Sequence, residues 1–434
     1  MFESLLVDNS PHWDGTLYQE GVPRAVLTRV KEYLELPHII ALVGVRRSGK
    51  STLVRQTINH LIRDKGVPPR NILFLNLENP QFSRYRKDVS YLAQAYDDYL
   101  KLVAPTGTVY CFLDEVHYFT EWQVFVKAMY EQKGIKFVVT GSNSHLLTSE
   151  FITILSGRAM PVEVYPFSFP EFVSARGLHI ADTVEMVRER NRLRGFLDEY
   201  QRFGGFPEIS TIVEPTIKKE ILTMYARNIL YQDIAPRFSI KKAVDLENLF
   251  FYLASNISTL YSFNKLADLV GLSDKTIKDY LGYFSDAYLL FTLDAFAFSA
   301  KEQIRSPKKV YAVDTGLASA VGFSFSDNQG RLLENLVFLE LKRRAHTLYY
   351  YKTSNGLEVD FACHCGGKIV RLIQVTHEMG EDQTRHRELR ALVKALEETS
   401  LDKGEIVTYE QEDEFLVDGK MISLIPAFKY LSDF

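Results

Sequence analysis

The residues with the clearest chemical meaning form a glycine-rich segment near the amino terminus. Residues 44–51 read Gly-Val-Arg-Arg-Ser-Gly-Lys-Ser, the Gly-x4-Gly-Lys-Ser spacing of a phosphate-binding loop. The backbone N–H groups of such a loop point at phosphate oxygens, and the start of a following helix favours the same negative charge. The segment therefore predicts a nucleoside triphosphate site made of Gly44, Val45, Arg46, Arg47, Ser48, Gly49, Lys50, Ser51 and Thr52.

Two side chains of this loop have predicted roles toward ATP and Mg²⁺. Lys50 neutralises the β- and γ-phosphates, and the Ser51 hydroxyl is offered to Mg²⁺. The apolar run 38–43 predicts a buried strand that enters the loop, and residues 52–56 open a helix after it. We expect the two arginines of the loop to pack it or to contact a neighbour rather than to act in catalysis.

A second motif adds the groups needed for hydrolysis. Residues 109–115 read Val-Tyr-Cys-Phe-Leu-Asp-Glu, an apolar strand that ends in two acids. In phosphate-loop enzymes an acid at this strand end holds the Mg²⁺ shell, and a following glutamate polarises the attacking water. The sequence therefore predicts Asp114 as the metal-side residue and Glu115 as the general base.

Two further positions are candidates for sensing or stabilising the γ-phosphate. The strand 136–140 runs into Gly-Ser-Asn, so Asn143 or Ser142 is the candidate sensor, although both residue types are also ordinary turn formers. Arg158 is the candidate for stabilising charge in the phosphoryl transition state, either within one chain or across a subunit boundary. The alternative for Arg158 is a structural salt bridge with the helical region that follows.

These motifs need a parallel sheet to bring them together. Residues 1–165 read as an α/β nucleotide-binding core, with a leading helix at 20–36, a strand at 71–77 and a crossover helix at 89–102. Strands alternating with helices imply a parallel sheet whose carboxyl edge carries the loop. We therefore expect both acids to lie beside the phosphate site.

The motifs together resemble those of predicted AAA+-superfamily ATPases of bacteria and archaea that carry a C-terminal domain of unknown function. The resemblance is carried by G-V-R-R-S-G-K-S-T, F-L-D-E-V-H, T-G-S-N-S-H-L-L, L-S-G-R-A-M-P-V-E-V-Y-P-F-S-F-P-E-F, F-G-G-F-P-E and L-E-N-L-V-F-L-E-L. These matches extend over most of the chain. They imply architecture and ATPase chemistry more than a biological role.

After a proline-punctuated boundary, two regions follow the core. Residues 166–239 are helical and charged and predict a lid, in which Gly204-Gly205 is a hinge or a tight turn. Residues 240–306 predict a winged helix-turn-helix, with helices at 263–270 and 275–286 and a wing strand at 289–298. Its lysines could face DNA phosphates, but nearby aspartates weaken that interpretation, and domain packing is the alternative.

The last region, residues 307–434, resembles the PD-(D/E)XK nuclease-like fold at the end of this family. Glu334 and Asp360 match two acids of that pattern, but Gln374 and Thr376 replace its third acid and its lysine. Without them phosphodiester hydrolysis loses charge and proton handling, so we predict that this domain does not cut DNA. A basic cluster could still hold DNA, although a solvated helix face is the favoured alternative; it comprises Arg331, Lys342, Arg343 and Arg344.

Composition limits the remaining choices. The 434 residues carry a net charge of −4, so nothing in the overall charge draws the chain to nucleic acid, and DNA binding needs a local basic face. No apolar stretch approaches the ~20 residues of a membrane helix. The start lacks the basic region of a signal peptide, and three cysteines favour a reducing cytoplasm.

The sequence thus predicts a cytoplasmic Mg²⁺-dependent ATPase with an α/β core, a helical lid, a winged helix and a nuclease-like domain. We expect a homo-oligomeric motor or remodeller that acts on DNA and does not bind membranes. The alternatives are a signalling switch, in which ATP gates contact with a protein partner, and an ATP-gated nuclease.

Overall fold

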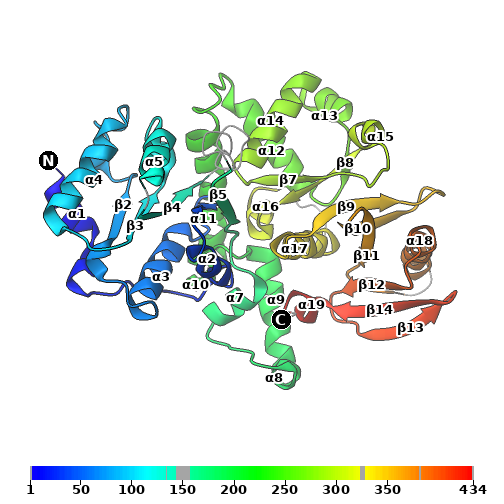
Figure 1. Cartoon of the computed structure of the whole chain (residues 1–434). Coiled ribbons are helices and arrows are strands. Elements are labelled where there is room, and N and C mark those ends of the chain that lie inside the picture. The colour runs from blue at the N-terminus through cyan, green and yellow to red at the C-terminus, as the bar shows by residue number, and fades with distance from the viewer. Residues whose placement is uncertain (1, 133, 143–156, 323–327, 381–382, 433–434) are drawn as a thin grey trace. The chain divides into compact units, whose positions relative to one another are not determined.

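The structure is a computed structural model of the chain, and it describes residues 2–132, 134–142, 157–322, 328–380 and 383–432 (Figure 1). The chain divides into two compact units, Met1–Tyr165 and Pro166–Phe434. Among the described residues, no helix is both long and apolar enough to cross a membrane.

The first unit is built on a parallel sheet of five strands in the order β2-β3-β4-β1-β5. All five residues of β1 are buried, as expected for a central strand covered by helices on both faces. The carboxyl ends of β1, β3 and β4 meet at one edge of the sheet, as the sequence predicts. The strands are β1 (Ile39–Val43), β2 (Ile72–Asn76), β3 (Val109–Asp114), β4 (Ile135–Gly141) and β5 (Ala159–Glu163).

Helices supply the rest of this core. Ile58 and Leu61 of α3 pack with Phe112 and Val138 of the sheet. The predicted helix 20–36 is wrong in its first turns, because Gly21 adopts φ +61° and Pro23 has no N–H to donate. The helices of this unit are α1 (Glu3–Asn9), α2 (Leu27–Leu34), α3 (Lys50–Arg63), α4 (Ser90–Val103) and α5 (Trp122–Glu131).

The second unit begins with helices. Ser168 caps α7 through a reciprocal capping box with Glu171, which explains why a helix starts directly after the proline-rich boundary. Helices α9 and α11 then lie against α16. These helices are α7 (Phe169–Ala175), α8 (Thr183–Arg188), α9 (Arg190–Phe203), α10 (Pro207–Thr211), α11 (Pro215–Asn228) and α16 (Thr315–Val321).

A small antiparallel sheet in the order β6-β8-β7 follows, together with the helices α12 to α15. Gly271 (φ +68°) ends α13, and the Ser273 side chain caps α14, which fixes the turn between them. The predicted strand 289–298 is too long, because the chain leaves the sheet and Phe296 donates to Tyr350 of β9 instead. The elements are α12 (Ala243–Ser255), β6 (Leu260–Tyr261), α13 (Phe263–Val270), α14 (Asp274–Asp286), β7 (Leu290–Leu293), α15 (Ala300–Arg305) and β8 (Lys308–Ala312).

The chain ends in a mixed sheet of six strands, β13-β14-β12-β11-β10-β9. Strand β12 pairs in parallel with β11 and with β14, and the other strand pairs described for this sheet are antiparallel. Helix α18 covers one face of this sheet through Leu392 and Leu396. The elements are α17 (Gln329–Arg343), β9 (Thr347–Lys352), β10 (Glu358–Cys365), β11 (Lys368–Val375), α18 (Gln383–Thr399), β12 (Lys403–Thr408), β13 (Asp413–Val417), β14 (Lys420–Pro426) and α19 (Ala427–Leu431).

The glycine pair after α9 forms a tight turn that is held by Asp314. Gly204 has φ +73° and ψ −166°, a conformation open almost only to glycine. The Asp314 carboxylate accepts hydrogen bonds from the N–H groups of Gly205 (2.7 Å) and Leu317 (2.9 Å). Burial raises the Asp314 pKa to about 6. Of the two predicted alternatives for Gly204-Gly205, these contacts support the tight turn and not the hinge.

Gly204→Ala is therefore expected to destabilise the second unit. Its Cβ would lie 1.9 Å from Asp314 Oδ1, so the carboxylate or the backbone must shift. We expect a loss of about 3 kcal/mol or more in the free energy of unfolding, measured by calorimetry. Gly195→Ala in α9 is the matched control, because its Cβ has open space and should be neutral or slightly stabilising. Equal losses in the free energy of unfolding for the two substitutions would contradict a strained turn held by Asp314.

Candidate functional site

The phosphate loop follows β1 directly, and one glycine makes its first step possible. A Cβ on Gly44 would lie 2.1 Å from the carbonyl oxygen of Val164, whose N–H donates to Val43 at 2.7 Å. Gly49 takes φ +97°, and α3 begins at the next residue. The buried side chain of Arg24 supports the loop by donating to the carbonyl of Ser48 at 2.8 Å. The loop thus has a close backbone approach at Gly44 and a left-handed turn at Gly49, and both positions favour glycine.

Lys50 connects this loop to the strand that carries the two acids. Its ammonium donates to the carbonyls of Gly44 (3.1 Å) and Val45 (3.2 Å) and lies 3.8 Å from Glu115 Oε1. Only 3% of the side chain is exposed. A buried cation between loop and acid strand is suited to neutralise phosphate oxygens.

Asp114 and Ser51 form the predicted metal side of the site. Asp114 Oδ1 accepts a hydrogen bond from Thr140 Oγ1 at 2.6 Å, and the Ser51 side chain hydrogen-bonds the same carboxylate. Burial and the charge of Glu115 raise the Asp114 pKa, although these hydrogen bonds and Lys50 oppose that rise. A carboxylate and a hydroxyl are oxygen ligands that suit Mg²⁺, and a buried acid with a raised pKa gains from a nearby cation. These residues therefore fit the expected ion.

Glu115 follows Asp114 directly, just beyond the end of β3. Its N–H donates to Thr140 Oγ1 (2.9 Å), and its φ of +57° turns the side chain back toward the loop. Burial raises its pKa, but Lys50 and His117 outweigh burial and the net pKa falls to about 2. Glu115 Oε2 lies 3.1 Å from His117 Nδ1, and this contact also favours the ionised carboxylate. An ionised carboxylate beside the loop suits a group that binds water.

Sequence reasoning missed Thr140 and His117. Thr140 bridges Asp114 and Glu115, and the only signal for it is a hydroxyl at the end of an apolar strand. Ser142 is buried at this edge of the sheet, whereas Asn143 lies outside the described residues. The predicted sensor role therefore stays a prediction.

The arginines of the loop and of the next segment have distinct surroundings. Arg46 pairs with Glu78 at 2.6 Å, and Arg47 adopts φ +67°. Arg158 lies 3.3 Å from Glu131 and 5.3 Å from the ring centre of Tyr130, with 39% of its side chain exposed.

Arg158 also lies far from the loop of its own chain. Its carbonyl accepts from Ile39 at the start of β1, whereas the loop follows the end of that strand. The five residues of β1 span about 15 Å, which argues against catalysis within one chain. The structural alternative is present as the pair with Glu131 rather than with the helical region that was predicted.

Two residues of the predicted basic cluster in the second unit make internal contacts. Arg343 donates to the carbonyls of Pro166 and Phe167, and Arg344 pairs with Glu340 at 3.0 Å. Lys342 lies 5.7 Å from the ring centre of Phe291. Packing therefore sets the positions of Arg343 and Arg344, and the possibility that the cluster holds DNA stays a prediction.

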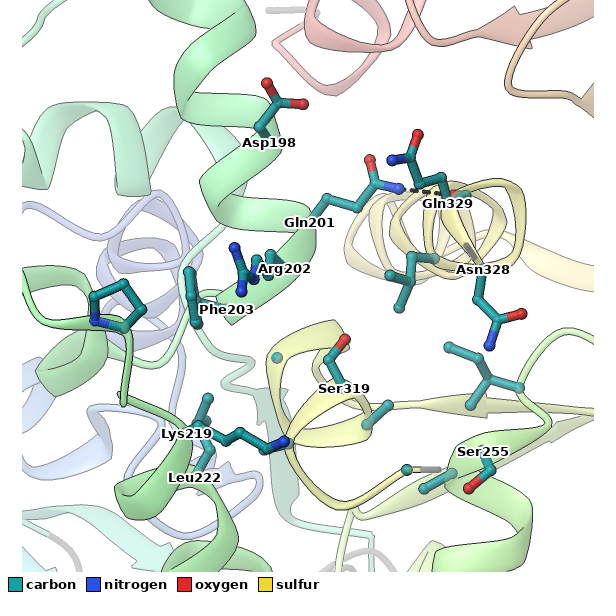
Figure 2. A pocket seen from close by; sticks show the side chains of 18 of the residues that line it. Asp198, Gln201, Arg202, Phe203, Lys219, Leu222, Ser255, Ser319, Asn328 and Gln329 are labelled. Atoms are coloured by element: carbon teal, nitrogen blue, oxygen red, sulfur yellow. Dashed lines mark hydrogen bonds between the residues drawn. The ribbon is translucent and has the colours of Figure 1, made fainter. Parts of the chain in front are cut away.

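A cavity of about 700 Å³ lies in the second unit, between α9, α11, α16 and the start of α17 (Figure 2). Asp198, Arg202 and Lys219 line it together with apolar groups such as Phe203 and Leu222. No residue predicted to bind nucleotide or metal lines this cavity.

The first unit is a parallel sheet whose edge carries a phosphate loop. Residues 37–173 match the model of an AAA domain, and residues 194–328 and 329–430 match the domains of unknown function DUF8612 and DUF4143. The boundary between the last two matched domains falls at 328/329, and the boundaries predicted from sequence at 239/240 and 306/307 stay predictions.

Relatives define the family further. The chain is 33% identical to the Uncharacterized protein MJ1544 of Methanocaldococcus jannaschii, over 99% of this chain and 95% of that protein. It is 29% identical to an Uncharacterized protein of Haemophilus influenzae, over 88% and 95% of the two chains. Among solved structures, the Walker-type ATPase PABY2304 of Pyrococcus abyssi matches 68% of this chain and 94% of its own, with 14% identity and a TM-score of 0.42. The chain belongs to the family of MJ1544.

Proposed function

We propose that this protein hydrolyses ATP with Mg²⁺. The observation that carries the proposal is the convergence of Lys50, Asp114 and Glu115 at one sheet edge, where the Thr140 hydroxyl bonds to the Asp114 carboxylate and to the backbone N–H of Glu115. Ser51 and Asp114 would hold Mg²⁺, which when bound neutralises charge on the β- and γ-phosphates. Lys50 binds the same phosphates, and Glu115 orients and deprotonates the attacking water.

We also propose that the second unit carries the output of this cycle. The order helix–strand–helix–helix–strand–helix–strand from α12 to β8, with an antiparallel sheet of three strands, supports a winged helix-turn-helix. Because β8 belongs to this sheet, we place the end of the winged helix after Ala312 rather than at 306. The helices between 166 and 239 form the lid, and the rest of the chain forms the nuclease-like domain.

DNA is the favoured partner of a homo-oligomer, and a protein partner is the second candidate. Lys275 and Lys278 of α14 are exposed, as a DNA reader requires, and this supports the first choice. The ring of Phe263 lies 5.1 Å from Lys278 Nζ, and Asp279 is exposed beside it, which weakens the basic face and supports the second.

DNA-dependent turnover separates these candidates. If the output is DNA, we expect duplex or single-stranded DNA to stimulate phosphate release, and Lys275→Ala with Lys278→Ala to remove the stimulation while basal turnover remains. Lys241→Ala with Lys242→Ala, a pair of exposed lysines outside α14, is the matched control. An ATP-dependent change in assembly size that DNA does not affect would favour a switch acting on a protein.

Mixing two inactive variants tests whether Arg158 acts across a subunit boundary. Glu115→Gln chains and Arg158→Ala chains should regain part of the native activity together, because a mixed interface pairs an intact base with an intact arginine. Phosphate release is the measurement, with co-assembly shown independently by sizing of tagged chains. Mixtures that co-assemble but stay inactive would leave Arg158 only its pair with Glu131.

A further inference from the structure

One buried lysine of the second unit lies among three carboxylates. Lys309 of β8 places its ammonium 3.0 Å from Glu334 Oε1, 2.8 Å from Asp360 Oδ1 and 2.8 Å from Glu358 Oε1. Lys309 is only 2% exposed, and Glu334 and Asp360 are also buried. An ammonium has three N–H donors, so one carboxylate is available for each of them.

Two further donors reach the carboxylates of this cluster. The Tyr311 hydroxyl donates at 2.7 Å to Glu334 Oε1, the oxygen that Lys309 also contacts, and the N–H of Val375 donates to Asp360 Oδ2 at 2.9 Å. Lys309 and Tyr311 lie on one strand, two residues apart, and therefore face the same side of it. The cluster is thus a network built from β8, α17, β10 and β11.

Gln374 isolates the cluster from a fourth acid. Its Oε1 accepts from the N–H of Asp360 at 3.2 Å, and its Nε2 donates to Glu388 of α18, which pairs with Arg387 at 2.6 Å. An amide at this position uses both its ends in hydrogen bonds. A carboxylate at this position would add negative charge beside Asp360 and Glu388. Among the described contacts of the network, Lys309 is the buried cation, and no second one balances this added charge.

Electrostatics favour a charged lysine at this place. Burial lowers the pKa of Lys309, but Asp360, Glu334 and Glu358 outweigh burial and the net pKa is raised well above its ordinary value. Burial and the charge of Asp360 raise the pKa of Glu334. Buried acids this close to one another need a cation between them, and the ammonium supplies it.

We propose that Lys309 is a built-in cation that occupies the position a divalent metal ion would need between Glu334 and Asp360. Mg²⁺ or Mn²⁺ at these acids requires the same oxygens that Lys309 already contacts, at much shorter distances and with several further oxygen ligands. Among the described residues, no group of three or more His, Cys, Asp or Glu side chains is arranged to hold a metal ion. The second unit therefore folds around its own lysine and does not need a metal. This inference does not depend on ATP hydrolysis by the first unit.

Removing the lysine should turn the cluster into a metal site. Lys309→Met in the full chain, without nucleotide and in EDTA, is expected to lower the melting temperature of the second unit by on the order of 10 °C. Mn²⁺ should restore much of this loss in Lys309→Met and leave the native protein unchanged. Lys308→Met, which removes the neighbouring ion pair with Asp294, is the matched control and should show no Mn²⁺ dependence. Calorimetry is the method, because both tryptophans, Trp13 and Trp122, belong to the first unit.

A second measurement remains decisive if Lys309→Met fails to fold. Titration of the native protein with Mn²⁺, followed by electron paramagnetic resonance, should give the same binding curve as Glu334→Gln and Asp360→Asn. Linear, nicked and branched DNA should stay intact with Mg²⁺ or Mn²⁺, with and without ATP. Mn²⁺ binding that either variant abolishes would overturn the proposal. Cleavage that disappears in Asp360→Ala would overturn it as well and would make the protein an ATP-gated nuclease.

Discussion

Glu115→Gln is expected to slow ATP turnover by about a hundredfold or more while ATP and Mg²⁺ still bind. Glutamine keeps the size of the side chain but cannot accept a proton from water. Lys50 and His117 hold the native group ionised, with its pKa lowered to about 2, so the charge that the substitution removes is present at neutral pH. The loss should appear in the rate of phosphate release at saturating ATP and not in nucleotide affinity.

The matched control for Glu115→Gln is Glu121→Gln, an exposed acid in the loop that follows β3. It should keep native turnover, because its carboxylate lies outside the cluster around Lys50. Binding of a fluorescent ATP analogue should be similar in both variants and in the native chain. Native turnover in Glu115→Gln would remove Glu115 from the mechanism.

Lys50→Ala is expected mainly to weaken the binding of ATP. The loop loses its buried ammonium and therefore one charge-assisted contact to phosphate. Loss of such a contact should weaken the affinity for ATP by roughly tenfold to a hundredfold. Titration with a fluorescent ATP analogue measures this loss. Lys65→Ala is the matched control, since Lys65 is an exposed lysine that pairs with Glu35 at 2.6 Å.

Lys50→Ala has a second expected effect, on Glu115. Without the ammonium 3.8 Å away, burial acts on Glu115 with less opposition, so its pKa should rise toward its ordinary value. Weak binding with an unchanged melting temperature would attribute the effect to the missing phosphate contact. Unchanged affinity for ATP would contradict the assignment of residues 44–52 as the nucleotide site.

The sequence was sufficient to predict a functional element where that element depends on residues that are neighbours in the chain. The loop at residues 44–51 and the acid pair after β3 follow from local patterns, because a strand, a tight turn and a helix in succession fix where their side chains go. The same holds for the turn between α13 and α14, where Gly271 and Ser273 are ordinary end signals for helices.

The sequence was insufficient to predict a site where the deciding contact joins segments that are distant in the chain. Thr140 reaches Asp114 and Glu115 only because β4 pairs with β3, and Lys309 meets Asp360 only when β8 and β10 come together. The residues after Leu293 leave their predicted strand because β9 offers a partner. Arg343 has the residue type of a surface cation, but it donates to carbonyls across the unit. No local pattern encodes such pairings.

Phosphate release from ATP by the purified native chain tests the central claim most directly. We expect steady turnover with Mg²⁺, loss of turnover in EDTA, and loss in Glu115→Gln prepared in parallel. The parallel variant excludes a contaminating ATPase, which the substitution would not affect. Phosphate release that is absent in the native chain with Mg²⁺, or equal in the native chain and Glu115→Gln, would contradict the account.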